Sequence, residues 1–219
     1  VEIINSNNIF FEPKKTESKI VATFNKHDEM LYRKHLSFSK GLNCATFESI
    51  SKNNCTKIET IHIPEITFPV LSTDLKTKDN NSDILSMDNI LNQPHEDILK
   101  LLKQFSNSYE TWINELNGNI PFDFEKEAKE NLEECRITKA RIDHGISMLS
   151  SIEIFQIWKD ANYVVNEQFH YSKKDIEFKW KPFQLGFFLL SIPGIVDPNH
   201  KDRNFADLLW VTTGGGKTE

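Results

Sequence analysis

The sequence has few cysteines, no long hydrophobic run and no visible targeting segment. Its three cysteines, Cys44, Cys55 and Cys135, are scattered and form no C-x-x-C pair, which argues against a disulfide framework or a cysteine metal site. No apolar stretch approaches the roughly 20 residues that a membrane-spanning helix needs. The chain starts at Val1 without a recognisable signal peptide. We therefore expect a protein of the reducing cytoplasm with no membrane segment.

The composition is that of a soluble globular protein, and its acidic excess is local. Hydrophobic residues make up 38% of the 219 positions, so one large domain or two small ones can bury a core. The formal net charge is −6, and residues 76–135 account for it with thirteen acidic and six basic side chains. Solvated helix faces explain this excess without a charged ligand. The remaining parts are neutral enough to contribute to a DNA path.

Glycine is sparse, with eight residues, but three glycines stand together near the C-terminal end and are followed by lysine and threonine. This order is typical of a phosphate-binding loop, because consecutive glycines let backbone N–H groups crowd around a phosphate. In such loops the lysine contacts the terminal phosphates and the threonine hydroxyl reaches Mg²⁺, so we expect ATP and Mg²⁺ as cofactors. Lys217 and Thr218 are the expected catalytic residues, with Thr218 as the magnesium ligand. The expected ATP-binding residues of the loop are Thr213, Gly214, Gly215, Gly216, Lys217 and Thr218.

The loop matches the helicase form of this motif. The general pattern G-x-x-x-x-G-K-[ST] requires a glycine where this chain has Val211. Superfamily 2 helicases and translocases carry a loop similar to T-G-x-G-K-T, which residues 213–218 match throughout. The short apolar run at residues 206–211 predicts a buried strand that leads into the loop. The alternative is a glycine-rich tail with no nucleotide site.

The first third of the chain, residues 1–75, predicts a β-rich domain. Apolar and polar residues alternate there in short runs, as expected of strands with one buried face. The runs are residues 19–24, 35–38, 44–47 and 57–63, and turn signals lie at 39–43 and 51–54. Residues 76–94 are a predicted linker, because residues 76–83 are polar and aperiodic.

Residues 95–170 predict a bundle of three helices. Pro94 opens the first helix, which residues 117–121 end, and Ser150 and Glu153 have the spacing of a capping box for the third. Apolar residues recur in each helix at the three- and four-residue spacing of one face. These are Ile98, Leu101, Leu102, Phe105, Tyr109, Trp112, Ile113 and Leu116 in the first helix, Ala128, Leu132, Cys135, Ile142, Ile146 and Leu149 in the second, and Ile154, Ile157, Trp158, Ala161 and Val164 or Val165 in the third.

Residues 171–219 predict a further helix before the strand and the glycine-rich loop. Pro182 can begin a strongly apolar helix that extends through Ile192. Pro193 and Gly194 are then expected to terminate it.

Several segments together resemble the helicase subunit of the DISARM anti-phage defence system. The most specific are W-K-P-F-Q-L-G-F-F-L-L at 180–190, D-P-N-H-K-D-R at 197–203 and D-L-L-W-V-T-T-G-G-G-K-T-E at 207–219. The resemblance continues upstream through residues 41–45, 109–113 and 141–146, so it covers most of the chain. Departures occur at Val211-Thr212, where the family is expected to have an aromatic residue and a proline, and at Leu42, where it usually has a histidine.

The resemblance implies a superfamily 2 motor with two RecA-like lobes, which binds DNA, hydrolyses ATP to translocate and restricts phage DNA with partner subunits. The expected fold class is then mixed α and β: a β-rich domain, a helical bundle segment, and the first strand and P-loop of a truncated RecA-like α/β domain at 171–219. The acidic D-E-x-[HD] motif and the arginine fingers of such motors lie downstream of the loop. We therefore expect these residues alone to be inactive in ATP hydrolysis.

A second contact with the nucleotide is expected at Gln184, thirty residues before Gly214. It resembles the adenine-reading glutamine of related helicases, because an amide can pair with both the N6 donor and the N7 acceptor of adenine. The alternative is a glutamine at a helix N-terminus that follows the packed residues Trp180 and Phe183. Phe183 itself either stacks on the base or belongs to the core.

Other polar residues are interpreted as structural. Asp143 and His144 are adjacent on a predicted helix and therefore point about 100° apart, which argues against a catalytic dyad. His200 and Arg203 are interpreted as solvated loop charges rather than contacts to phosphate or DNA.

Two other classes of function remain open. One is a different P-loop ATPase, such as an AAA-type remodeller, which would lack helicase motifs in two lobes. The other is a non-catalytic module that binds protein or DNA. Binding to DNA would weaken with salt, whereas docking to a protein subunit through apolar contacts would not.

Overall fold

The computed structural model describes residues 2–4, 26–33, 38–39, 44–51, 54–61, 83–173 and 176–208. The chain splits into two compact units. The first comprises residues 1–69 and 121–128, and the second comprises residues 70–120 and 129–219. The domain boundaries expected from the sequence stay predictions.

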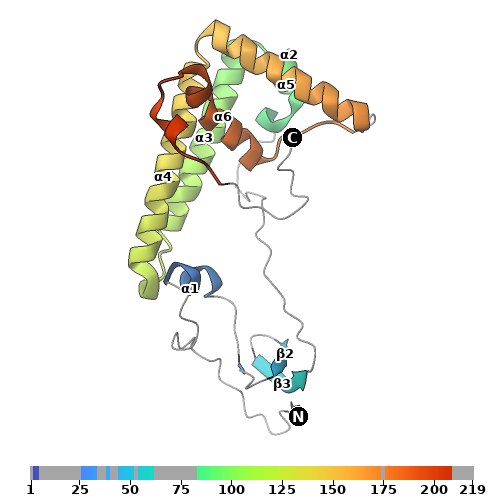
Figure 1. Ribbon diagram of the computed structural model, residues 1–219, viewed down its shortest axis with the longest axis vertical. Coiled ribbons are helices and arrows are strands. Elements are labelled where there is room, and N and C mark those ends of the chain that lie inside the picture. Colours follow the sequence, from blue (N-terminus) through green and yellow to red (C-terminus); the bar gives the residue numbers. More distant parts are fainter. Residues whose placement is uncertain are drawn as a thin grey trace. The chain divides into compact units, whose positions relative to one another are not determined.

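A small antiparallel sheet is the main described feature of the first unit (Figure 1). Its strands are β1 (Glu2–Ile4), β2 (Ala45–Ser51) and β3 (Asn54–Ile61), in the order β1-β3-β2. β2 and β3 form a hairpin in which Phe47 lies opposite Glu59. The strand predicted at 44–47 is thus confirmed, and so is the one predicted at 57–63 as far as Ile61, beyond which residues 62 and 63 are not described. The run at 19–24 and most of the run at 35–38 lie outside the described residues.

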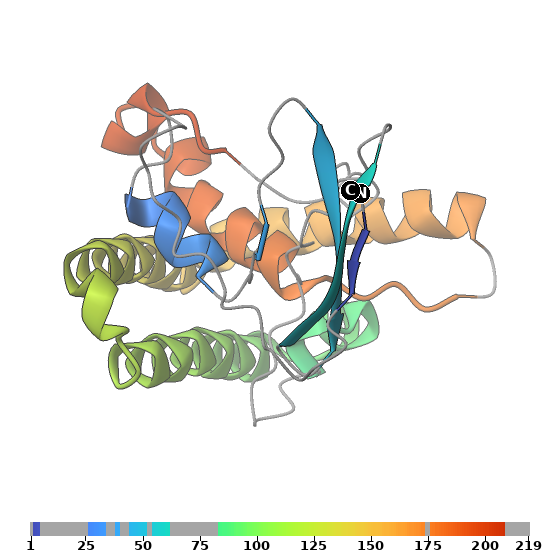
Figure 2. The same ribbon diagram turned by 90° about the horizontal axis from the view of Figure 1, so that it is seen from below.

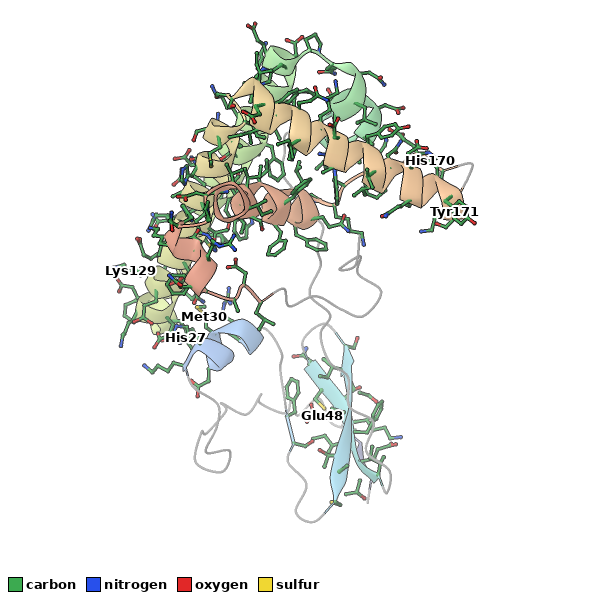
Figure 3. All side chains as sticks on the ribbon, turned by 45° about the horizontal axis from the view of Figure 1, so that its top comes forward. His27, Met30, Glu48, Lys129, His170 and Tyr171 are labelled. Carbon is green, nitrogen blue, oxygen red and sulfur yellow. The ribbon has the colours of Figure 1, made fainter. Side chains whose placement is uncertain are left out.

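Glu48 of β2 fixes a neighbouring part of the chain (Figure 3). One oxygen of its carboxylate accepts hydrogen bonds from the backbone N–H groups of Phe38, at 2.9 Å, and Ser39, at 2.6 Å. The Ser39 hydroxyl donates to the same oxygen at 2.6 Å. The first unit also contains α1 (Lys26–Tyr32), which lies beside the short helix η2 (Phe122–Phe124).

The second unit is helical. Its long helices are α3 (His95–Asn117), α4 (Glu125–Met148), whose first turn belongs to the first unit, and α5 (Ile152–Ser172). α3 and α4 run side by side in opposite directions (Figure 1 and Figure 2). Shorter elements complete the unit: η1 (Asp83–Leu85), α2 (Met87–Asn92), α6 (Pro182–Val196) and η3 (Lys201–Asn204). The prediction of three helices over 95–170 is confirmed.

A continuous apolar core joins these helices. α6 lies at its centre because its residues are apolar all round, and Leu185 and Leu189 are both fully buried. Burial of such side chains is the main favourable contribution to folding. The other buried members of the core are Ile84, Met87, Ile90, Ile98, Leu102, Phe105, Ile142, Ile146, Leu149, Phe155, Trp158, Phe178, Trp180, Leu190 and Ile192.

Asn162 on α5 is a polar residue inside this core, with no exposed surface. Its amide nitrogen donates to the carbonyl of Trp158 at 2.8 Å, and its amide oxygen accepts from the indole N–H of Trp180 at 2.8 Å. Asn162 therefore connects α5 to the segment before α6 while satisfying its own amide. The indole N–H of Trp158, by contrast, has no hydrogen-bond partner among the described residues.

Two predictions about helix ends are wrong. Ser151 rather than Ser150 precedes α5, so Glu153 falls at the second helical position and cannot form the predicted capping box. Pro193 and Gly194 do not terminate α6, which continues to Val196. A proline near the end of a helix removes only one backbone hydrogen bond, and Pro193 is buried in the core, so packing outweighs that loss.

The predicted apolar face of α5 is also partly wrong. Ile157 is 65% exposed, whereas Phe155 and Asn162 are buried. Of the two alternatives Val164 and Val165, Val164 is exposed and Val165 packs against the core. The helix is apolar on more than one side, so its sequence does not decide which side its neighbours cover. The far end of α5 extends away from the core, where Tyr171 is exposed (Figure 3).

The described residues contain no RecA-like parallel sheet, and the glycine-rich loop lies outside them. The start of a RecA-like domain at 171–219 therefore stays a prediction. Ala206 to Leu208 are irregular and exposed, so no strand begins at Ala206. Residues 209–211 of the predicted strand are outside the described part.

Candidate functional site

Apart from Gln184, the residues expected to bind ATP lie at the C-terminal end of the chain, beyond the last described residue, Leu208. This applies to Thr213, to the three glycines at 214–216, and to Lys217 and Thr218. Their roles at phosphate and magnesium stay predictions. The described structure instead shows what holds the segment that leads towards them.

Gln184 is half-buried near the N-terminus of α6. Its side-chain oxygen accepts a hydrogen bond from the backbone N–H of Lys181 at 2.8 Å, and Pro182 occupies the first position of the helix. An N3 glutamine that reaches back to the N-cap amide is one half of a capping box, so Gln184 helps to set the start of α6. Its expected contact with adenine stays a prediction.

The segment from Asp197 to Asp207 connects α6 to the predicted loop and is organised by its own hydrogen bonds. Asp197 accepts a hydrogen bond from the backbone N–H of Asn199 at 2.9 Å. His200 caps η3, because its Nδ1 accepts a hydrogen bond from the Asp202 backbone N–H at 3.3 Å. The segment thus turns back on itself directly after α6.

Arg141 of α4 binds this segment through two carboxylates, those of Asp202 and Asp207. Its Nε donates to Asp202 at 2.9 Å. Its two terminal nitrogens donate to the two oxygens of Asp207, at 2.7 Å and 2.8 Å. This forked geometry is the strongest form of an arginine–carboxylate pair, because two parallel charge-assisted hydrogen bonds form at once.

The electrostatics of the pair follow from this geometry. The hydrogen bonds from Arg141 hold the pKa of Asp207 below its usual value of 3.8, although partial burial of the carboxylate opposes the shift. In turn, the hydrogen bonds to Asp207 raise the pKa of Arg141 above its usual value. The Arg141 side chain is 24% exposed, so the surrounding water screens the pair only in part.

Arg203 makes a second connection between the segment and α6. Its guanidinium donates to the backbone carbonyl of Gly194 at 2.6 Å. His200 lies near His144 of α4, with 5.4 Å between the ring centroids. His200 and Arg203, which the sequence suggested as solvated charges, therefore have structural contacts. A shallow pocket of about 270 Å³ is lined by Arg141, Leu190, Ser191, Gly194, Asp202, Arg203 and Asp207.

The sequence argued against an acid–base pair of Asp143 and His144, and the contacts of Asp143 agree with that interpretation. Asp143 accepts hydrogen bonds from the hydroxyl of Ser106 on α3 and from Lys139 at 2.7 Å. Lys139 also pairs with Glu110 at 3.2 Å. This network connects α3 to α4 and provides no free base.

Sequence reasoning missed the role of Arg141. In the sequence Arg141 stands out only as part of the segment 141–146, and its partners lie 61 and 66 residues further along the chain. No local pattern in the sequence pairs residues at such separations. Two aspartates close together before the predicted loop, Asp202 and Asp207, were the available sign that a basic partner binds there.

Over residues 83–173, 176–208 and the shorter described parts, no group of three or more His, Cys, Asp and Glu side chains could hold a metal ion. None of the described helices is long and apolar enough to cross a membrane.

A comparison with known proteins confirms the resemblance to a DISARM protein that the sequence indicated. No family model matches the chain. The chain is similar to the DISARM protein DrmA of Bacillus paralicheniformis, with 33% identity over 253 aligned positions, gaps included. The alignment takes in 98% of this chain but only 22% of DrmA. The chain is therefore related along nearly its whole length to a DISARM protein, and it spans about a fifth of that relative's length.

Proposed function

We propose that this chain, a relative of the DISARM protein DrmA, is part of an ATP-dependent DNA helicase or translocase that acts in anti-phage defence in the cytoplasm. One observation carries the proposal: the sequence T-G-G-G-K-T at residues 213–218, in a chain related to a DISARM protein over 98% of its length. A glycine-rich loop of this kind is a phosphate-binding element, and the helicase form of the motif fits it at every position.

The donor set of the loop fits ATP with Mg²⁺. Lys217 would contact the β- and γ-phosphates, Thr218 would place its hydroxyl on the metal ion, and the glycines would offer their backbone N–H groups to the phosphates. Gln184 would read the adenine edge. When bound, Mg²⁺ would neutralise the charge that develops on the phosphates. The expected acidic D-E-x-[HD] motif does not occur in these 219 residues, so hydrolysis would require the rest of the protein.

DNA and partner subunits of a defence complex are the proposed partners. Residues 136–219 carry eleven basic and ten acidic side chains, so this part of the chain imposes little repulsion on a phosphate backbone. The β-rich part and the helices would then form an accessory module that shapes a DNA path or docks a partner subunit. Such a module needs polar side chains that hold its elements together, and Asp143 and Arg141 have contacts of this kind.

ATP hydrolysis by the full-length protein tests the proposal. Turnover should rise on addition of DNA, and Lys217→Ala should lower the DNA-stimulated rate by about a hundredfold or more, because the phosphates lose their fixed positive charge. Lys201→Ala is the matched control, since Lys201 is an exposed lysine of η3 outside the loop. It should hydrolyse ATP at the native rate.

The alternatives predict different results in the same experiment. Turnover that does not respond to DNA would contradict the translocase function and favour a protein-remodelling ATPase. Native activity in Lys217→Ala would contradict the nucleotide site itself. Salt-insensitive binding to another defence subunit, without ATP hydrolysis, would favour a non-catalytic docking module.

A further inference from the structure

Arg141 connects the core of the second unit to the segment that leads into the predicted loop. We propose that Arg141 is a positioning residue for the nucleotide site: through Asp202 and Asp207 it fixes the approach of the chain to the glycine-rich loop. The inference rests on the proposed function, because it assigns a role to Arg141 at that same site. It assigns no direct contact between Arg141 and the nucleotide.

The shape of the contact supports a positioning role. A guanidinium that donates two parallel hydrogen bonds to one carboxylate fixes the orientation of its partner as well as its distance. The third hydrogen bond, from Nε to Asp202, ties the same guanidinium to a second point of the segment. The Asp202 side chain is 14% exposed, so its carboxylate is largely withdrawn from water, whereas the Asp207 side chain is 36% exposed.

Arg141 lies on a helix that packs closely against α6. Gly145, one helical turn further along α4, packs directly on the backbone of Leu189 in α6. The Arg203 side chain ties η3 to the carbonyl of Gly194, near the end of the same helix. The segment is therefore held from α4 at Asp202 and Asp207 and from α6 at Arg203. A charge pair positions its partner only when its own support does not move, and this support is a packed helix pair.

The end of the segment around Asp207 is held by this pair rather than by a helix or strand. Among the described residues, Ala206 and Leu208 are exposed and lie outside any helix or strand. The hydrogen bonds found for the side chain of Asp207 are those with Arg141. Asp207 precedes Gly214 by seven residues and Lys217 by ten. An error in the direction of the chain at Asp207 would therefore be passed towards the loop, whose amides must meet the phosphates within a fraction of an ångström.

Nucleotide kinetics of the full-length protein test this role. Arg141→Gln and Asp207→Asn each remove the charge pair while leaving a polar side chain of similar shape. We expect each variant to raise the KM for ATP by about tenfold, since small errors of position weaken phosphate contacts. The affinity for DNA should stay within about twofold of native, because no DNA contact is assigned to either residue. Binding of a fluorescent ADP analogue measures nucleotide affinity independently of turnover, and it should weaken in the same two variants.

The control variant is Arg136→Gln. Arg136 is an exposed arginine of the same helix, and its described partner is Glu133, three residues earlier, at 3.5 Å. Its loss removes a positive charge from α4 without touching the segment. The KM for ATP in this variant should be native.

A double-mutant cycle separates positioning from a general loss of structure. If Arg141 acts through Asp207, the double variant should raise KM no more than Arg141→Gln alone, because that variant already removes the contact with Asp207. Arg141→Lys should restore KM only in part, since an ammonium lacks the fork that meets both carboxylate oxygens. Melting temperatures of all variants identify any that fail to fold.

The outcomes distinguish this inference from the proposed function. A native KM in Asp207→Asn, with Lys217→Ala inactive, would overturn the positioning role and leave the proposed function standing. A lowered melting temperature in Arg141→Gln with unchanged nucleotide affinity would likewise overturn it, because the role would be purely structural. Native activity in Lys217→Ala would overturn the proposed function first.

Discussion

Gly145 of α4 and Leu189 of α6 meet backbone to backbone. A Cβ atom on Gly145 would lie 2.8 Å from the carbonyl carbon of Leu189 and closer still to its oxygen. The residue four positions after Leu189 is Pro193, which has no N–H to donate to that carbonyl. The two helices therefore approach more closely than side chains would allow, and this contact lies one turn from Arg141.

Gly145→Ala should destabilise the second unit. The added methyl group meets backbone atoms, which cannot rotate away as a side chain can, so the helices must separate. We expect the free energy of unfolding to fall by about 2–3 kcal/mol. Urea unfolding followed by tryptophan fluorescence measures this change.

Gly118→Ala is the control for that measurement. Its added methyl group would lie 3.6 Å and 3.7 Å from the nearest atoms, which is ordinary contact, and its φ of −72° suits alanine. This variant should be as stable as the native chain or slightly more stable. Equal stability of the two alanine variants would show that the helices can separate without cost.

Loss of the indole N–H should reduce the free energy of unfolding more at Trp180, where it donates a hydrogen bond, than at Trp158. Trp180→Phe leaves the buried oxygen of Asn162 without its donor, whereas Trp158→Phe removes an N–H that has no partner among the described residues. Both side chains are almost fully buried, so the loss of packing is similar. We expect Trp180→Phe to cost about 1–3 kcal/mol more. Equal losses in urea unfolding would contradict the hydrogen-bond account.

The Arg141–Asp207 pair should give stability that disappears in acid. The pKa of Asp207 lies below its usual value of 3.8 in the folded chain, so its stabilising effect is complete above that value and is lost as the pH falls below it. The difference in unfolding midpoint between the native chain and Asp207→Asn should be constant from about pH 7 to about pH 5 and shrink below 3.8. A midpoint difference that grows on acidification would contradict a lowered pKa of Asp207 in the folded chain.

The cysteines should differ in reactivity. Burial raises the pKa of the Cys55 thiol above its usual value of 9.0, and Cys55 has no exposed surface. Cys44 is exposed. Because the thiolate is the reactive form, iodoacetamide should modify Cys44 well before Cys55 under native conditions. Peptide mass spectrometry over time measures both rates, and denatured protein, in which the rates should converge, is the control.

The helices were predictable because their signals are local. Pro94 directly precedes α3, and Gly118 directly follows it, as the sequence indicated. The buried positions of α4 at Leu132, Ile142 and Ile146 follow the predicted spacing. The β2–β3 hairpin was likewise indicated by alternation and a turn signal.

Predictions that depended on neighbouring elements were less successful. The N-cap of α5 was placed one residue too early, and α6 was ended too soon at Pro193. The covered side of α5 could not be read from a helix with apolar residues on several sides. At the end of α6 and along α5, packing against other helices outweighed the local preference.

The sequence by itself determined the helical middle of the chain, the hairpin, the relation to a DISARM protein and the motif on which nucleotide binding is proposed. Each of these depends on the order of residues within a short window or along an alignment. Only the tertiary structure decided that Arg141 binds Asp202 and Asp207, that Gly145 meets Leu189, and that Asn162 bridges to Trp180. These contacts join residues far apart in the chain, and they form because the packed core fixes helices at distances that no local pattern records.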